Sequence, residues 1–420
     1  DFFTSQYIVN ERYARYISSR GSGHCNTDSR KGREAMNTRI EPSGGGEDIP
    51  ERGQAPPQRH VFRDAEKTYA RRVRPKNGTR GKLVEEVVDL SDVVDFSKLT
   101  FDEGEGKVTW HAGRWGNVHR VRQGMDGSDV LVYSFDRHPG FFILRRGLDE
   151  ALASRMAVQC LGDAVLRPPA TTNFNKSHGL CIRGLWDAAM RNLRLVDDAS
   201  TTGSPTKWAC DGNGKPASEF LASLRWASIG PCYDWTRRVY LKDQDYVPLP
   251  DNMKIFAERV WALVGGHAAC GGAEYRPNAA LINYYREGDK LCGHVDDAEI
   301  DQKWPLVSIS LGCPAVFLMG GESKDVVPTP MLLRHGDVAV LSGAARRAYH
   351  GLPRIFPANR EHQLVDSDGR PVPDPHAREG SGPLPSCVLY SRERCFGTTP
   401  TSPVEGYLRD CRINISIRQV

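Results

Sequence analysis

The sequence predicts an α+β protein whose core is an antiparallel double-sheet jelly roll or barrel, with flanking helices and a disordered N-terminal extension. After residue 278, short apolar runs alternate with turns that contain glycine or proline, a pattern typical of antiparallel strands. Residues 1–58 are instead rich in Gly, Ser, Pro, Arg and Glu. Such a stretch buries too little apolar surface to offset its ordering entropy, so we expect it to be disordered.

The expected core strands are short and closely spaced. Turn pairs such as Gly320-Gly321 and Gly336-Asp337 separate them, and a Pro- and Ser-rich tract at 357–403 interrupts the core before its last strand. The strands are expected at 279–285, 305–311, 315–319, 331–335, 338–341 and 412–420.

The elements before the core are predicted from periodicity and from capping residues. A short helix is expected over 61–73, and a second one over 149–165. Asp251 is a candidate N-cap for a third helix that runs to about residue 267. Paired valines broken by acids over 83–99 indicate a docking arm, and 133–144 is expected as a single strand that reaches the core.

The expected domain organisation has three parts. Residues 1–58 form the extension, and residues 59–145 form an N-terminal arm with a short helix. Residues 146–420 form the catalytic domain, which includes a nucleotide-recognition lid at 222–246 and the Pro-rich insertion at 357–403.

Composition limits the class of protein. The chain has 420 residues, a hydrophobic content of 39% and a formal net charge of only +4, so any nucleic-acid surface must come from local clustering of basic residues. Eleven cysteines without C-x-x-C spacing argue against a disulfide framework and a structural zinc site, and they indicate a reducing, intracellular location. The sequence does not distinguish nucleus, cytoplasm and mitochondrion. It begins at Asp1, so we expect a fragment or a processed form, and no apolar run suggests a membrane helix.

A candidate metal site is formed by His294-Val-Asp296 together with the distant His350. Residues i and i+2 of a strand face the same side, so His294 and Asp296 can point into a barrel together. Two imidazoles and one carboxylate on one side of a metal are typical of non-heme Fe(II) oxygenases. An H-x-D pair alone is weak evidence, because most histidines are solvent-facing or hydrogen-bonded bystanders.

The last strand adds cationic residues to this site. Arg412, Asn414, Ser416 and Arg418 lie on one face by period-two spacing, and isoleucines occupy the other face. Two arginines that face a barrel interior are costly unless an anion pairs with them, and a guanidinium binds a carboxylate through two parallel hydrogen bonds. The alternative for an isolated strand of this pattern is a polar face turned to solvent.

Several motifs, taken in order, resemble the AlkB family of Fe(II)- and 2-oxoglutarate-dependent nucleic-acid dioxygenases, and most closely its AlkB homolog 1 subgroup. The resemblance is strong over 222–420, weaker back to residue 59, and absent from the first 58 residues. It implies a double-stranded β-helix (jelly-roll) core. The motifs are Asn283-Tyr-Tyr285, Gly288-Asp-Lys-Leu291, His294-Val-Asp296, the stretch 305–312, Tyr349-His350-Gly351 and the stretch 412–418.

The resemblance implies roles for eight residues. His294, Asp296 and His350 match the iron ligands, and the implied cofactors are Fe(II), 2-oxoglutarate as co-substrate and O2. Arg412 matches the residue that binds the distal carboxylate of 2-oxoglutarate, and Arg418 the one near the iron-chelating end. The remaining co-substrate residues are Asn283, Tyr285 and Asn414.

On the substrate side, the resemblance implies nucleic acid as the partner, either tRNA or single-stranded or unpaired DNA, for a protein that acts as a monomer away from membranes. Trp226 and Tyr233 in the lid are candidates to stack on a base, and Arg346 matches an arginine near the mouth of the site. The alternative is that these aromatic residues only pack within the protein. Ala298 stands where some relatives have an acidic residue that contacts the methylated base.

The expected function is oxidative demethylation of N-methylated bases, with release of formaldehyde, succinate and CO2. The candidate substrates, 1-methyladenine in tRNA and N6-methyladenine in DNA, come from the resemblance. Two other functions stay open: a non-catalytic nucleic-acid-binding jelly roll, and a protein demethylase or hydroxylase on the same scaffold.

Overall fold

The computed structural model describes most of the chain after residue 59. The described residues are 60–420, apart from 71–72, 76–82, 86–87, 98, 100–106, 112–114, 126, 197–204, 235–238, 267–272, 300, 357–399 and 401. The expected extension at 1–58 and most of the expected insertion at 357–403 therefore lie outside the described residues.

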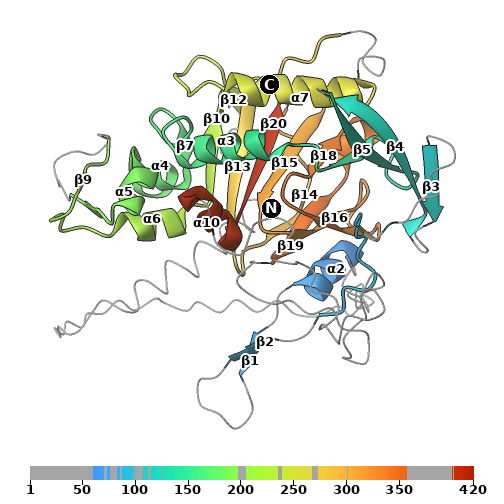
Figure 1. The fold of residues 1–420 in the computed structure, drawn as a ribbon, viewed down its shortest axis with the longest axis horizontal. Helices are drawn as coiled ribbons and strands as arrows, with labels where there is room; N and C mark the ends of the chain where they lie inside the picture. Colours follow the sequence, from blue (N-terminus) through green and yellow to red (C-terminus); the bar gives the residue numbers. More distant parts are fainter. Residues whose placement is uncertain are drawn as a thin grey trace, which may run out of the picture. The chain divides into compact units, whose positions relative to one another are not determined.

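A large antiparallel sheet forms the centre of the molecule (Figure 1). The last strand of the chain, β20, lies inside this sheet, where it pairs with β13 on one side and with β15 on the other. In sheet order the strands are β3 (Lys107–His111), β4 (Asn117–Met125), β5 (Ser128–Phe135), β6 (Phe141–Arg145), β18 (Val338–Leu341), β15 (Leu306–Gly312), β20 (Cys411–Arg418), β13 (Ala279–Arg286), β10 (Trp226–Ile229) and β7 (Thr171–Thr172).

A smaller antiparallel sheet packs against this one. Phe141 and Leu341 of the large sheet share a buried cluster with Met319 and Met331 of the small sheet. The small sheet has the order β14 (Leu291–His294), β19 (His350–Ile355), β16 (Ala315–Met319) and β17 (Thr329–Leu333). Separate two-stranded pairs are β1 (Val73–Pro75) with β2 (Leu83–Glu85), β8 (Arg194–Leu195) with β9 (Trp208–Ala209), and β11 (Cys232–Asp234) with β12 (Val239–Leu241).

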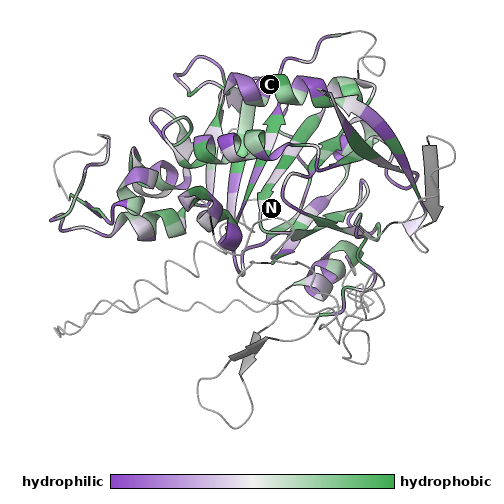
Figure 2. Cartoon of the chain, in the orientation of Figure 1, coloured by the Kyte–Doolittle hydropathy of each residue, from purple (hydrophilic) through white to green (hydrophobic). Residues whose placement is uncertain are grey.

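Helices cover the other face of the large sheet. Buried residues such as Met156 and Phe256 share one core with the isoleucines of β20, and Figure 2 shows the apolar strands beneath these helices. The described helices are α2 (Val61–Tyr69), α3 (Glu150–Leu161), α4 (Asn173–His178), α5 (Leu185–Met190), α6 (Ala217–Ser223), α7 (Asp251–Leu263) and α10 (Pro403–Asp410). None of these described helices combines the length and the apolarity that crossing a bilayer requires.

Several expected boundaries are wrong. The helix expected over 61–73 ends at Tyr69, and the third helix ends at Leu263 rather than at about residue 267. Three further differences have a local reason. The predicted strand at 133–144 is a hairpin of β5 and β6, because Gly140 adopts φ +84° and turns the chain. The helix expected to reach residue 165 ends at Leu161, where the Gly162 N–H caps the Val158 carbonyl. Asp251 is the first residue of α7, and Pro250 is its N-cap.

Within the expected docking arm at 83–99, Val94 and Asp95 contact the small sheet and the residues that follow it. Val94 donates its N–H to the Pro330 carbonyl (2.9 Å) and accepts from the Leu332 N–H (3.0 Å), so the arm pairs with the outer edge of β17. Asp95 then forms two hydrogen bonds with the Arg334 guanidinium, at 2.7 and 2.8 Å. The later part of the expected N-terminal arm at 59–145 contains β3–β6, which belong to the large sheet.

Candidate metal centre

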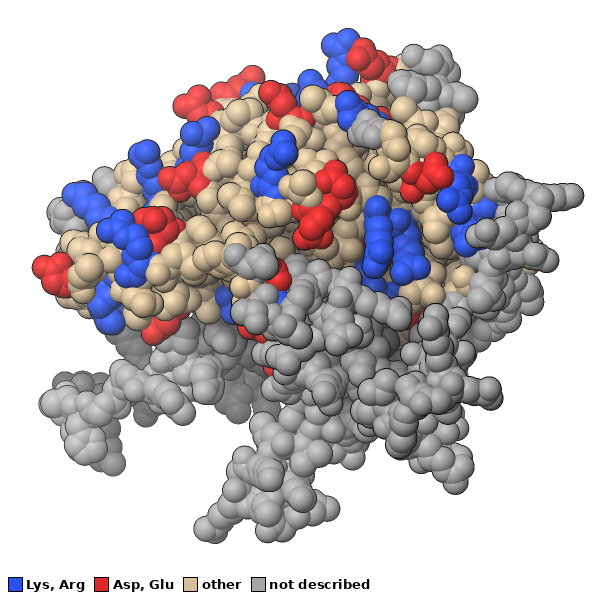
Figure 3. Space-filling view, in the orientation of Figure 1, with Lys and Arg blue, Asp and Glu red and all other residues tan. Residues whose placement is uncertain are grey.

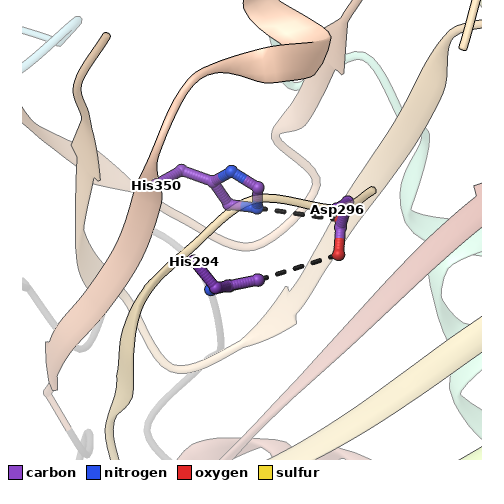
Figure 4. Close-up of side chains that lie close together, drawn as sticks. All are labelled: His294, Asp296 and His350. Carbon is purple, nitrogen blue, oxygen red and sulfur yellow. Dashed lines mark ion pairs between the residues drawn. The ribbon is translucent and has the colours of Figure 1, made fainter. Parts of the chain in front are cut away.

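The two histidines and the aspartate converge at the end of the small sheet (Figure 4). His294 is the last residue of β14, His350 is the first residue of β19, and the two are register partners. Asp296 lies in the loop that follows β14, and its carboxylate oxygens are 3.8 Å from His294 Nε2 and 3.7 Å from His350 Nε2. The three potential ligand atoms lie within 4.8 Å of one another, a separation that one metal ion can bridge.

Backbone carbonyls orient both imidazoles. Nδ1 of His294 is 2.9 Å from the Cys292 carbonyl, and Nδ1 of His350 is 3.2 Å from the Ala348 carbonyl. A ring that donates from Nδ1 keeps the Nε2 lone pair for a metal, which is the usual arrangement around ligating histidines. Both Nε2 atoms accordingly point to the Asp296 carboxylate.

The charge states at the site suit metal binding. Burial, with the neighbouring His294, lowers the pKa of His350 to about 4, so this imidazole is neutral at physiological pH. Burial alone would raise the pKa of Asp296, but the Arg418 guanidinium and the two imidazoles hold it well below its usual range. The site therefore presents neutral imidazole and ionised carboxylate, the forms that ligate metals.

Helix α2 supports the ligand strand from outside. Gly293, just before His294, donates its N–H to the Glu66 carboxylate. A Cβ at Gly293 would come within 2.5 Å of the Phe62 ring, so this position requires glycine for close packing rather than for a turn. Helix α2, which belongs to the expected N-terminal arm, thus packs against the edge strand β14.

The polar face of β20 points to the same interior. Arg412 and Arg418 are 1% and 5% exposed, so the alternative of a solvent-facing strand is wrong. Arg412 donates to the Cys313 carbonyl (3.0 Å) and to Ser310 Oγ (2.6 Å). Among described residues, Arg412 Nε and the Nε and Nη2 atoms of Arg418 are buried without a hydrogen-bond partner. A bound dicarboxylate would satisfy such donors.

The neighbouring strand places the other expected co-substrate residues beside these arginines. Tyr285 is the register partner of Arg412, and Asn283 is the partner of Asn414, so the four side chains share one face of β13 and β20. Asn414 donates to Ser308 Oγ (2.8 Å) and to the Ile309 carbonyl (3.1 Å), which fixes its amide against β15. The structure therefore brings together all five residues expected at the co-substrate site.

The expected substrate residues occupy three different environments. Trp226 on β10 is the register partner of Asn283 and is half-buried. Tyr233 on β11 packs against Tyr240 on β12, with ring centroids 5.1 Å apart. Arg346 is buried, with an exposure of only 1%, in the 3₁₀ turn η2 (Gly343–Arg347) and has no surface position.

The bonds of Arg346 hold the metal-binding loop. It donates to the Asp296 carbonyl (2.8 Å), to the Trp304 carbonyl (3.2 Å) and to the Glu299 carboxylate (2.7 Å). Sequence reasoning missed Glu299. The available signal was an acidic residue three positions after a metal-binding aspartate, in a chain that buries several arginines nearby.

Comparison with known proteins agrees with this geometry. The family model described as the 2OG-Fe(II) oxygenase superfamily matches residues 186–418, more than half of the chain. The "DNA N(6)-methyladenine demethylase ALKBH1A" of Arabidopsis thaliana is 32% identical over 86% of this chain and 96% of its own length. The human "Nucleic acid dioxygenase ALKBH1" is 28% identical over 79% of each chain. The "tRNA demethylase abh1" of Schizosaccharomyces pombe is 28% identical over 56% of this chain and 74% of its own. With its His-Asp-His site and its paired arginines, the chain belongs to the 2OG-Fe(II) oxygenase superfamily and, within it, to the AlkB homolog 1 family.

Proposed function

We propose that this protein is an Fe(II)- and 2-oxoglutarate-dependent dioxygenase that removes methyl groups from N-methylated bases in nucleic acid, on a double-stranded β-helix core. The observation that carries the proposal is the convergence of His294, Asp296 and His350 beside two buried arginines. The names of the relatives support nucleic acid as the substrate and make 1-methyladenine in tRNA and N6-methyladenine in DNA the first candidates.

The protein's first task is to hold the metal and the co-substrate side by side. His294, Asp296 and His350 would bind Fe(II) on one face, which leaves positions for 2-oxoglutarate and O2. When bound, these groups supply the oxidation of an N-methyl carbon, with release of formaldehyde, succinate and CO2. The chain contributes position and partial exclusion of water, since both histidines are buried and the Asp296 side chain is 16% exposed.

The co-substrate fits along β20. Arg412 would take the distal carboxylate, because its hydrogen-bond partners in the part of the chain that the structure describes are neutral and burial lowers its pKa to about 10, so it gains most from an anion. Arg418 would steady the end nearest the metal, since its guanidinium is 3.7 Å from Asp296. Asn283, Tyr285 and Asn414 would complete the hydrogen bonds on the shared face.

The nucleic acid is proposed to enter beside Trp226 and the β11–β12 hairpin. Trp226 and Tyr233 would stack on an unpaired or extruded base, since a base inside a duplex cannot reach a buried metal. Arg346 would act by holding the metal-binding loop at the mouth of the site. On the face that α3 and α7 cover, basic and acidic side chains of the described residues are interspersed (Figure 3). A face of mixed charge attracts a polyanion less than a basic face does, so we do not assign nucleic acid to it.

We propose that the protein works as a monomer inside the cell. The seven free cysteines among the described residues favour a reducing location.

The test supplies the full chain with Fe(II), 2-oxoglutarate and, in separate arms, 1-methyladenine tRNA, an N6-methyladenine single strand or a methylated peptide. Mass spectrometry of nucleosides should show loss of the methyl mark from at least one nucleic acid, with stoichiometric succinate. Asp296→Ala should abolish both signals. Arg347→Ala, an exposed neighbour paired with Glu322, is the matched control and should keep them. Turnover only with the peptide, or none with any substrate, would contradict the proposal.

A further inference from the structure

Glu299 is a buried carboxylate at the edge of the site that the proposed reaction does not use. It lies three residues after Asp296 and is 4% exposed. One oxygen, Oε2, accepts from Arg346 Nη2 at 2.7 Å. The other, Oε1, accepts from Arg418 Nη1 at 2.8 Å and from the Tyr240 hydroxyl at 3.1 Å.

The three donors come from three separate elements. Arg346 belongs to η2, Arg418 to the central strand β20, and Tyr240 to β12 of the hairpin that carries Tyr233. Burial alone would raise the pKa of Glu299, but the Arg418 and Arg346 guanidinium groups lower it, so the carboxylate stays charged. A charged carboxylate that is fully bonded in a buried site fixes the positions of its partners.

The arrangement at Oε1 links two functional regions. Arg418 uses Nη1 for Glu299, while its Nε and Nη2 are buried without a hydrogen-bond partner among the described residues, and Nη2 lies 3.7 Å from Asp296 of the metal centre. Tyr240 bonds the same oxygen and packs its ring on Tyr233. A movement of the hairpin therefore changes the bonding of the oxygen that orients Arg418.

We propose that Glu299 is a positioning residue that couples the β11–β12 hairpin to the 2-oxoglutarate site through Tyr240 and Arg418. This inference rests on the proposed function, since it assigns nucleic acid to the hairpin and 2-oxoglutarate to Arg418. Nucleic acid that holds the hairpin in place would keep Tyr240 on Oε1 and Arg418 in position, which strengthens the binding of co-substrate. Because coupling between two sites is reciprocal, co-substrate then strengthens the binding of nucleic acid by the same factor. The consequence is that co-substrate is held most firmly when a substrate is present.

The simpler alternative is that Glu299 only neutralises two buried arginines. Tyr240→Phe separates the two ideas, because it keeps the aromatic ring and both ion pairs and removes only the hydroxyl, which bonds Glu299 Oε1 and also interacts with Arg418. Neutralisation predicts no change in coupling for this variant. Coupling through Tyr240 predicts that each ligand still binds but no longer affects the other.

The experiment measures binding without turnover. Isothermal titration gives the Kd of N-oxalylglycine for the full chain loaded with Mn(II), with and without a saturating methylated single-stranded oligonucleotide. In the unmodified chain the oligonucleotide should lower this Kd about fivefold or more, within the usual range of coupling between sites. In Tyr240→Phe the two values should agree within about twofold. Tyr246→Phe removes the hydroxyl of an exposed tyrosine near the hairpin and should behave like the unmodified chain.

A second variant tests the positioning of Arg418 directly. Glu299→Gln keeps the shape of the side chain but removes the charge that holds the guanidinium, so the Kd of N-oxalylglycine should rise even without oligonucleotide. Circular dichroism checks that the variant folds, and Tyr240→Phe remains the deciding variant if it does not. Coupling that persists in Tyr240→Phe, or no coupling in the unmodified chain, overturns this inference alone. Failure of the unmodified chain to bind N-oxalylglycine or any oligonucleotide overturns the proposed function as well.

Discussion

The two ends of strand β20 carry the same residue type in opposite electrostatic settings. Arg418, at one end, pairs with Glu299 at 2.8 Å and lies 3.7 Å from Asp296. Arg412, at the other end, is bonded among the described residues to a backbone carbonyl and a serine hydroxyl. Burial lowers the pKa of both, but at Arg418 the neighbouring acids and Tyr240 reverse the direction, whereas at Arg412 the pKa falls to about 10.

The protein itself balances the charge of Arg418, whereas a bound ligand would balance the charge of Arg412. A buried charge with a partner costs little, while one without a partner is destabilising until an anion arrives. Arg418 is already compensated by the protein, so its role is to be in place beside the metal ligands. Arg412 forms no ion pair among the described residues, and the attraction of Asp337 does not offset its burial, so it should dominate the affinity for a dicarboxylate.

The largest expected effect comes from removing each charge in the absence of co-substrate. Arg418→Met leaves Glu299 and Asp296 without their shared cation and should lower the free energy of unfolding by about 3 kcal/mol. Arg412→Met removes an uncompensated charge and should leave the free energy of unfolding unchanged or raise it. Urea unfolding of the two variants measures this contrast. Equal destabilisation by both would remove the electrostatic distinction between the two ends of β20.

The sequence could predict which residues meet at this strand, because its alternation is a property of any extended chain. It placed Arg412 and Arg418 on one face, and the structure buries that face. It also brought His294 and Asp296 together by their spacing, although β14 ends at His294 and Asp296 lies in the following loop. The i, i+2 spacing therefore still holds His294 and Asp296 on one side although the strand has just ended at His294.

Sequence could not predict which arginine is compensated. That depends on the path of the loop after His294, which delivers Glu299 to Arg418 and not to Arg412. Loop paths follow from tertiary packing, which periodicity does not encode. The same reason explains why the support of Gly293 by Phe62 and Glu66, more than 200 residues earlier in the chain, was missed.

An intermediate effect concerns co-substrate affinity. Arg412→Lys keeps the charge but cannot form two parallel hydrogen bonds with a carboxylate. The binding of N-oxalylglycine should therefore weaken by about 2 kcal/mol, which raises its Kd roughly thirtyfold. The matched control is Arg347→Lys on the nearby exposed pair with Glu322, which should leave the Kd unchanged. Calorimetry with Mn(II) in place of iron reads this without turnover. An unchanged Kd in Arg412→Lys would mean that this end of β20 does not bind the carboxylate.

The smallest expected effect uses Arg334, a half-buried arginine outside the proposed co-substrate site, as a reference. Arg334 holds Asp95 of the docking arm through two hydrogen bonds. Burial alone would raise the pKa of Asp95, but Arg334 and Ser97 lower it from 3.8 to about 2. Because the folded value lies below the unfolded one, the pair stabilises the fold above about pH 4 and loses this contribution as the pH falls towards 2.

That contribution is about 2 kcal/mol at neutral pH, of which roughly 1 kcal/mol is lost between pH 6 and pH 3. Urea unfolding between pH 6 and pH 3 should therefore show a loss of stability that Asp95→Asn largely abolishes, because the amide cannot titrate. Addition of N-oxalylglycine should not alter the Asp95-dependent part, whereas it should stabilise the unmodified chain through Arg412. If the ligand also changed the contribution of Asp95, the Asp95–Arg334 pair would be coupled to the co-substrate site. Arg334 could then not serve as a reference for the two arginines of β20.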